Sequence, residues 1–376
     1  MNEDILLSPG NLSAGKKAFL LQALAQSQQV LSLKKATAGF DGFVDTIVRI
    51  VKDKKQGGAP VYFKTIKEFG EYVLEKQGAS FSLELEEHQI KLGGNMPIMA
   101  NAMGRLGIPV NCIGAFGYPA LHPVFLQLSF NCHSLSFTDP GLSTACEFND
   151  GKMLLAQMGK INSAGWNDIK EKIKPELLGP AFKDLDLLCL LNWSEIDAAT
   201  DTWKGIVKDV FEIGDIPAAI FIDLSDCTRR DPGTIREVLN LINLFSKKSR
   251  VILSLNKNEA TVLFRLASNE ALPADLGTLG KSLFETLKVE TLVLHSSKRA
   301  IAITAESHAA LETFHTAQPA ISTGAGDNFN AGFCAAQLLA LDLELCLLLA
   351  NAVAGIYVRT GVSPEINDVI NFIEKI

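Results

Sequence analysis

The stretch RVILSLNKNEA, residues 250–260, joins a nearly continuous apolar run to residues that commonly begin a helix. An apolar run without alternation is typical of a strand that is covered on both faces, as in a parallel sheet. We therefore predict an α/β protein with a three-layer core, in which a mainly parallel sheet is flanked by helices. Three more stretches share this character, and helical segments separate them: LDLLCLLNW (185–193), AAIFIDLS (218–225) and TLVLHSS (291–297).

Polar residues close the four apolar runs, namely Asn192, Asp223, Asn256 and His295. Parallel strands bring their carboxyl ends to one edge of the sheet, where ligands bind in open α/β folds. We therefore expect the functional site at this edge. The six histidines of the chain show no spacing typical of metal ligands, and we assign chemistry to none of them.

Two other segments alternate apolar and polar residues, as expected of strands with one covered face. The first is SFSLELEEHQIKL, residues 80–92, which follows a predicted helix over residues 61–77. The second is the pair STACEFND and KMLLAQMG, joined around Asp150 and Gly151, whose dipeptide is a strong hairpin signal. We predict a small sheet that acts as a lid, with strands from about residues 42–92 and 110–160.

Composition limits the class of protein. Hydrophobic residues make up 47% of the 376 positions and charged residues 20%, which indicates a globular chain, and the apolar runs are broken too early to span a bilayer. The net charge of -7 gives no broad attraction to nucleic acid or to an anionic membrane. The seven cysteines include no CxxC pair, and the first residues lack a signal-peptide pattern, so we predict reduced thiols and a cytoplasmic location.

The stretch TGAGDNFNAGF, residues 323–333, passes from small residues into a helical pattern. The backbone N–H groups of Gly324, Ala325 and Gly326 would lie at a helix N-terminus, which favours an anion such as a phosphate. Asp327 would then face the transferred group and accept a proton from an attacking hydroxyl. In the alternative interpretation the glycines only allow a tight turn and Asp327 caps the helix, and this stretch alone does not separate the two.

This stretch resembles the carboxyl-terminal TGAGD signature of the ribokinase, or PfkB, family of carbohydrate and nucleoside kinases. The resemblance implies a ribokinase-like fold in which Asp327 is the catalytic base and the three residues before it, Gly324, Ala325 and Gly326, form an anion hole for the transferred phosphoryl group. TGAGD at this distance from the chain end is a specific match.

The domain organisation combines this resemblance with the pattern at the start of the chain. Residues 11–33 carry good helix formers with apolar residues at helical spacing, and Asn11 or Ser13 is a suitable cap. The resemblance begins near residue 36. We predict an N-terminal helical extension over residues 1–35 and a kinase domain over residues 36–376.

Two further motifs resemble those of the same family. SLNKNEA contains its NxxE motif as Asn256 and Glu259, whose oxygens suit Mg²⁺, often through water. KLGGNMP resembles its diglycine motif, which implies that Gly93 and Gly94 let the backbone approach a sugar and that Asn95 bonds its hydroxyls. The resemblance thus implies a magnesium site and a substrate site.

The stretch GFDGFVD, residues 39–45, resembles the segment with which relatives hold sugar hydroxyls after the first core strand. It implies that Asp41 and Asp45 bind the acceptor, because carboxylates accept hydrogen bonds from paired hydroxyls and reject analogues that lack them. The same spacing also suits a ribose.

Other positions of the resemblance concern the nucleotide. Ser296 and Arg299 occupy the places of two glycines around the phosphates, so that Arg299 would either block the loop or bind phosphate. Ile321 replaces an acid that helps to bind a monovalent cation in several relatives, which puts such activation in doubt here. Asn351 falls in the helix that closes the adenine pocket. The predicted nucleotide-binding residues are Asn256, Ser296, Thr323 and Asn351.

We predict an enzyme that transfers the γ-phosphoryl of ATP, with Mg²⁺, to a hydroxyl of a sugar or sugar derivative under the lid. A nucleoside kinase of the same fold is one alternative, and a non-catalytic ligand-binding regulator with a degraded nucleotide loop is another. A dehydrogenase fits less well, because no GxGxxG motif follows the first strand. The predicted partner is a small sugar-like molecule and neither nucleic acid nor a membrane, with a homodimer through the lid as an option.

Overall fold

The computed structural model describes residues 8, 12–55, 57–268 and 270–376 of the chain. In these residues the strands β12 to β6 of a nine-stranded sheet are parallel, while β13 and β14 are antiparallel at one edge, so the predicted mainly parallel sheet is confirmed. The strand order is β14 (His308–Glu312), β13 (Arg299–Ile303), β12 (Thr291–His295), β11 (Arg250–Asn256), β10 (Ala219–Asp223), β9 (Leu187–Leu190), β1 (Ala36–Gly39), β5 (Val110–Gly114) and β6 (Cys132–Ser136).

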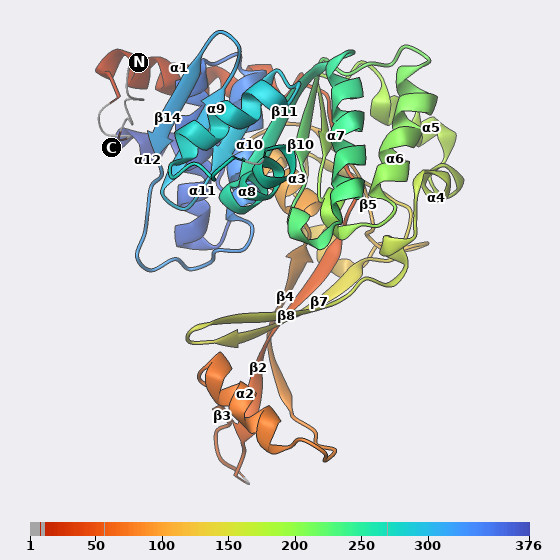
Figure 1. Cartoon of the computed structure of the whole chain (residues 1–376), viewed down its shortest axis with the longest axis vertical. Helices are drawn as coiled ribbons and strands as arrows, with labels where there is room; N and C mark the ends of the chain where they lie inside the picture. Colours follow the sequence, from red (N-terminus) through yellow and green to blue (C-terminus); the bar gives the residue numbers. More distant parts are fainter. Residues whose placement is uncertain (1–7, 9–11, 56, 269) are drawn as a thin grey trace.

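Helices cover both faces of this sheet, so the core has the three predicted layers (Figure 1). Alternate strand residues enter separate cores, as Phe221 and Ile222 of β10 do, because neighbouring side chains of a strand point to opposite faces. The core of one face includes α1 (Ala14–Leu31), α3 (Asn95–Arg105), α10 (Ala325–Leu338), α11 (Leu343–Thr360) and α12 (Ile366–Glu374). The core of the other includes α4 (Trp166–Lys172), α5 (Pro175–Leu178), α6 (Ala199–Ile206), α7 (Pro232–Ser246), α8 (Lys257–Ala267) and α9 (Leu276–Thr286).

Local capping explains where the helices near the sheet edge begin. The Asn256 side chain accepts hydrogen bonds from the amides of Asn258 at 2.8 Å and Glu259 at 3.0 Å, so that β11 passes directly into α8. The Glu259 carboxylate accepts a hydrogen bond from the Asn256 amide at 2.8 Å, which completes a capping box. The NxxE motif therefore has a structural role, because it fixes the junction between β11 and α8.

Helix α11 is, among the described residues, the helix that is long and apolar enough to cross a membrane. The apolar composition of α11 is explained by its place in the core, because 61% of the helix is buried inside the protein and it packs against α10. Asp342 caps its start by accepting from the Leu345 amide at 2.9 Å, and Gly361 ends it with a φ of 77°.

A second sheet leaves the carboxyl edge of the first and projects away from the core (Figure 1). The hairpin of β7 and β8 turns at the predicted Asp150–Gly151 dipeptide. Helix α2 (Ile66–Glu75) packs near its far end, around a small apolar cluster that contains Val48, Phe63 and Cys146. The strands are β2 (Phe43–Asp53), β3 (Val61–Tyr62), β4 (Leu85–Gly93), β7 (Gly141–Phe148) and β8 (Gly151–Gln157).

Two details of this sheet differ from the predictions. The helix predicted over residues 61–77 begins only after Thr65, whose side chain caps α2, because Val61 and Tyr62 pair with β2 instead. The alternation in β4 predicts one covered face, yet Leu85 is 50% exposed and Ile90 42%. The reason is that β4 is an edge strand and the cluster under α2 is built on β2 and β7.

The N-terminal helix α1 is part of the layer that covers one face of the sheet. Leu20, Leu24 and Leu31 are buried in the core of that face. Ser13 caps the helix by accepting from the Lys16 amide at 3.3 Å, while the alternative cap Asn11 lies outside the described residues. The domain boundary at residue 35 stays a prediction.

Candidate functional site

Helix α10 presents the TGAGD motif at the carboxyl edge of the large sheet. Gly324 precedes the helix with a φ of 89°, a conformation that favours glycine, and a Cβ there would lie 2.7 Å from the Tyr357 hydroxyl. The Ala325 amide donates to the Ser322 carbonyl at 3.2 Å. In the described residues no acceptor meets the amides of Gly324 and Gly326. Two of the three amides predicted to be free are thus unpaired, and the third is used by the turn.

Asp327 lies in the first turn of α10 and is buried. Its carboxyl group lies near the Asn95 side chain, from the first turn of α3, and both line one cavity. Burial raises the pKa of Asp327 well above its usual range, and the nearby Asp223 and Asp41 carboxylates raise it further. A carboxyl group with a raised pKa is a stronger base than an exposed one.

A chain of buried hydrogen bonds ties α10 to the strands behind it. The Asn330 Nδ2 donates to Asp223 Oδ2 at 2.7 Å, and Ser254 Oγ donates to Asn330 Oδ1 at 2.8 Å. Asp223 also accepts from the Ser225 amide at 2.9 Å. The sequence analysis missed Asn330, although its position three residues after Asp327 places both on one face of the helix.

Asp41 caps the helix that follows the diglycine motif, and its predicted contact with sugar hydroxyls stays a prediction. Its carboxylate accepts from the amides of Asn95 at 2.9 Å and Met96 at 2.8 Å, which caps α3, and from Asn192 Nδ2 at 2.6 Å. The residue is fully buried, and burial raises the pKa of Asp41 to about 6 in spite of these bonds. Asp41 therefore positions Asn95, which in turn reaches Asp327.

Asp45 and the two glycines lie where the lid meets the core. Asp45 is in register with Lys91 on β4, and a Cβ at Gly93 would lie 2.3 Å from Asp45 Oδ1. Gly94 has a φ of 93°, and a Cβ there would lie 2.7 Å from Asp41 Oδ2. Burial raises the pKa of the Asp45 carboxyl group and lowers the pKa of Lys91. The glycines thus leave room for the two carboxylates.

An acidic cavity of about 550 Å³ opens in front of Asp327 and Asn95. Five carboxylic acids line it: Glu195, Asp223, Asp226, Glu259 and Asp327. Burial, with the neighbouring Asp223 carboxylate, raises the pKa of Glu259 to about 9. Glu195 is paired with Arg229, but Asp223, Glu259 and Asp327 are buried and, within the described structure, none of these three has a basic partner. Buried acids of this kind suit a divalent cation. In the described part of the chain no three side chains form a ready metal site, so an ion would share its coordination with water or phosphate.

A second cavity, of about 620 Å³, lies on the other side of the α10 N-terminus and brings together Asn256, Ser296 and Asn351, three of the residues predicted to bind the nucleotide. Asn351 donates to the Glu312 carbonyl at 3.1 Å, while its Oδ1 is buried without a partner in the described structure. We call this space the base cavity. Ile321, the replacement for the expected acid, is one of its apolar lining residues.

Hydrogen bonds in the turn between β12 and β13 fix the backbone of Arg299. The Ser296 hydroxyl donates to the Arg299 carbonyl at 3.0 Å and accepts from the Arg299 amide at 3.1 Å. The Arg299 side chain lines neither cavity, and its charge instead acts on Asp275. This placement supports neither predicted role of Arg299, blocking the loop or binding phosphate, and both stay predictions.

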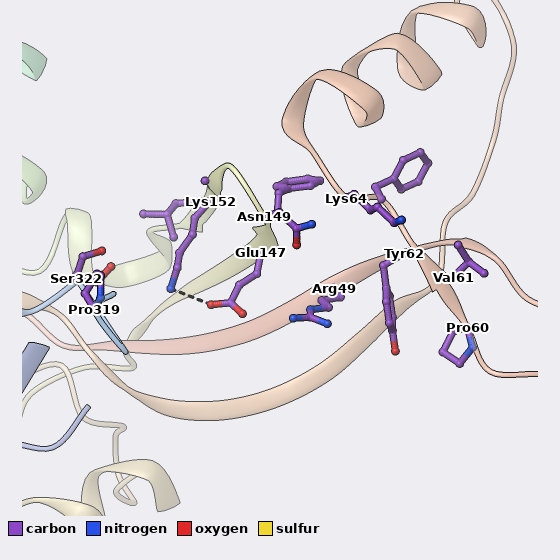
Figure 2. Close-up of a pocket in the computed structure, with 15 residues that line it drawn as sticks. Arg49, Pro60, Val61, Tyr62, Lys64, Glu147, Asn149, Lys152, Pro319 and Ser322 are labelled. Carbon is purple, nitrogen blue, oxygen red and sulfur yellow. Dashed lines mark ion pairs between the residues drawn. The ribbon is translucent and has the colours of Figure 1, made fainter. Parts of the chain in front are cut away.

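The lid and the segment before α10 enclose a third space, a groove of about 860 Å³ (Figure 2). Lys152 and Glu147 of the lid form an ion pair at 2.9 Å that faces this groove, and Arg49 stacks over the Tyr62 ring at 5.5 Å. Thr323, predicted to bind the nucleotide, lines this groove and not the base cavity.

Solved structures with this fold include two ribokinases. The chain superposes on ribokinase from Arabidopsis thaliana, complexed with ribose and ATP, with a TM-score of 0.64 at 17% identity, over 91% of this chain and 99% of that one. For a putative ribokinase II from E. coli in complex with ATP and Mg²⁺ the TM-score is 0.61 at 15% identity, over 92% and 100%. The fold is therefore that of the ribokinase class of kinases.

The chain belongs to the prokaryotic ketohexokinase family, whose model matches residues 20–376. A ketohexokinase from Haloferax volcanii is 28% identical over 337 residues, which cover 89% of each chain. The protein is therefore an ATP-dependent carbohydrate kinase, as predicted. The family supports this conclusion over the nucleoside-kinase and regulatory alternatives.

Proposed function

We propose that the protein transfers the γ-phosphoryl of ATP to a hydroxyl of a ketohexose, with Asp327 as the general base. The observation that carries this proposal is the place of the Asp327 carboxyl group, which faces the acidic cavity directly beside the unpaired Gly326 amide. A base and an anion-binding backbone at one point are what an attack by a hydroxyl on a phosphoryl group requires. The ketohexose is suggested by the family and by the Haloferax relative.

The residues around Asp327 would position its carboxyl group and stabilise the charge on the transferred phosphoryl group. The raised pKa of Asp327 makes it ready to accept the hydroxyl proton, and the Asn95 side chain lies beside its carboxyl group. The amides of Gly324 and Gly326, with the dipole of α10, stabilise negative charge on the transferred group, while Ala325 closes the turn that presents them. Asp41 fixes Asn95 through the cap of α3.

The nucleotide and its metal fit the two cavities. The adenine would occupy the base cavity, where Asn351 Oδ1 lacks a hydrogen-bond donor and Ser296 lines the wall. Asn256 and Glu259 would hold Mg²⁺, in part through water, because they line the acidic cavity and supply oxygen ligands. When bound, this ion would neutralise charge on the phosphates.

The acceptor would lie under the lid. Asp45, Asn95 and the backbone at Gly93 and Gly94 surround the place where the lid strands join the core, so they are the residues that we assign to the sugar hydroxyls. Lid closure would exclude water and limit hydrolysis of ATP.

We further propose a homodimer through the outer face of the lid. Ile90 and Leu155 share a row across the sheet, on the face opposite Asp45, and are 42% and 54% exposed, with Leu142 on the same face 48% exposed. Light scattering of Leu155→Lys should show a smaller species than the wild type, and an unchanged mass would contradict this interface.

The seven cysteines, all within the described residues, are free, and six of them are buried. Reduced thiols of this kind support a cytoplasmic location. Retention of full activity and of seven titratable thiols in a reducing buffer would agree with this proposal, whereas a stable disulfide in the purified protein would contradict it.

The test of the reaction is mass spectrometry of a mixed pool of ketohexoses, aldoses, sugar acids, sugar phosphates and nucleosides incubated with protein, Mg²⁺ and ATP. A ketohexose heavier by one phosphoryl group is expected, and NMR of that product names the hydroxyl. Asp327→Asn should lower turnover by about 100-fold or more while it keeps ATP binding. The matched control is Asp201→Asn, on the exposed face of α6. Near-normal turnover of Asp327→Asn would overturn the assignment of the base.

A further inference from the structure

The acidic cavity and the base cavity share four lining residues, Asn256, Asn258, His295 and Gly326. We call these four residues the neck. Asn256 and His295 end neighbouring strands and are in register, while Gly326 faces them from the first turn of α10. A ligand that extends from the base cavity to Asp327 must pass through the neck, because it is where the two spaces meet.

The His295 ring is held firmly in this neck. Its centroid lies 5.0 Å from that of Phe329, at an interplanar angle of 35°, and Phe329 is itself buried. A Cβ built on Gly326 would lie 3.4 Å from His295 Cε1, so the ring packs against the turn that carries the unpaired amides. Within the described structure no hydrogen bond is formed by either ring nitrogen. The fold therefore fixes the position of the His295 ring but gives its nitrogens no hydrogen-bond partner in the described structure.

Few positive charges lie around the neck. The acidic cavity contributes five carboxylic acids, while among the described lining residues of both cavities Lys257 alone carries a permanent positive charge. Few side chains around the neck can therefore neutralise the negative charge of a bound polyphosphate. A neutral imidazole offers one N–H donor, which suits a hydrogen bond to a phosphate oxygen.

We propose that His295 is a phosphate-binding residue, whose ring N–H donates a hydrogen bond to a phosphate oxygen of the nucleotide as it passes through the neck beside the Gly326 amide. This inference rests on the proposed function, since it names a further residue that holds the phosphoryl donor. It predicts a contribution that depends on the phosphates and not on the base. The contact would hold nucleoside diphosphates and triphosphates, and it would be absent for adenosine.

Calorimetric titration distinguishes a contact with the phosphates from a contact with the base. ADP, a non-hydrolysable ATP analogue and adenosine are titrated in excess Mg²⁺ into the wild type, His295→Leu and His295→Gln. His295→Leu should weaken ADP and the ATP analogue by about tenfold or more, the usual effect of losing a hydrogen bond to a charged group, and leave adenosine unchanged. His295→Gln keeps an N–H donor and should recover most of the affinity. His133→Leu, on the exposed edge strand β6, is the matched control.

Each other outcome decides against the inference in its own way. An equal loss for adenosine and ADP would mean that His295 only shapes the base cavity, and unchanged affinities for all three ligands would mean that it touches none. Either result leaves the proposed function standing, provided that the wild type binds ADP more tightly than adenosine. A wild type that binds no nucleotide would overturn the proposed function together with this inference. Should His295→Leu fail to fold, His295→Met, which also lacks an N–H donor, takes its place at the same three ligands.

Discussion

The Asn330 side chain donates a hydrogen bond to Asp223 at 2.7 Å and so joins the helix that carries Asp327 to the end of β10. The bond has two effects on the site. It fixes one acid of the cavity, and it holds the first turns of α10 against the sheet through the second bond to Ser254. Asn330 is thus a positioning residue, because it reaches the reacting atoms only through its neighbours.

Asn330→Ala should lower kcat by about tenfold and leave the KM for ATP nearly unchanged, because Asp223 and α10 would lose their shared anchor. It should also reduce the free energy of unfolding by about 1–3 kcal/mol for each buried partner that is left unpaired. Steady-state kinetics and urea unfolding measure both effects. Asn240→Ala, on the exposed face of α7, is the control. A loss of stability with kcat unchanged would restrict Asn330 to the fold.

The pH dependence of the reaction should report Asp327. Only the ionised carboxylate accepts a proton, so kcat/KM should fall as the pH falls through its pKa. Because burial raises the pKa of Asp327, the decline should begin at a higher pH than for an ordinary aspartate. The profile is measured from about pH 5 to about pH 9. Since burial raises the pKa of Asp41 to about 6, Asp41→Asn is measured beside it, and disappearance of the acid limb in that variant would assign the limb to Asp41.

Glu259→Gln should raise the half-saturating concentration of Mg²⁺ by about tenfold, because it removes a charged oxygen ligand from the acidic cavity. Glutamine at this position still completes the capping box of α8, so the fold should be kept. The measurement is a titration of turnover with Mg²⁺ at saturating substrates. Glu285→Gln, exposed on α9, should behave like the wild type. An unchanged titration in Glu259→Gln would remove this residue from the metal site.

Asn351 should read the amino group of adenine, because its buried Oδ1 accepts a hydrogen bond and has no partner. The wild type should prefer ATP to ITP, whose base carries a carbonyl at that position. Asn351→Leu should remove the preference and raise the KM for ATP by about threefold to tenfold. Competition kinetics with the two nucleotides measures this, with the exposed Asn367→Leu as control. An ATP preference that survives in Asn351→Leu would show that other groups select the base.

The architecture could be predicted because its signals are local. An apolar run such as residues 250–255 can be buried on both faces only in a covered parallel sheet, and the polar residue that ends it must lie at the carboxyl edge. The α10 N-terminus could be predicted from TGAGD for the same reason, since the small residues and the helical pattern follow one another directly. These features depend on residues that are neighbours in sequence.

The features that were missed depend on contacts between distant segments. The sequence does not show that Asp41 caps a helix that begins 54 residues later, or that Ser254 and Asn330, 76 residues apart, share a buried bond. His295 lacks any ligand spacing along the chain and gains its place only when β12 meets α10. The direction of the Arg299 side chain likewise depends on a turn whose hydrogen bonds no motif describes.

The lid is attached to the core through strands whose ends meet at one point. β2 begins two residues after Asp41, β4 ends at Gly93, and the Asp41 carboxylate holds the amides that follow. Because this junction closes the loop, the chain between residues 53 and 85 can lengthen, shorten or acquire a helix such as α2 without shifting Asp327. The outer part of the lid is consequently a module that can vary while the core beneath it keeps its geometry.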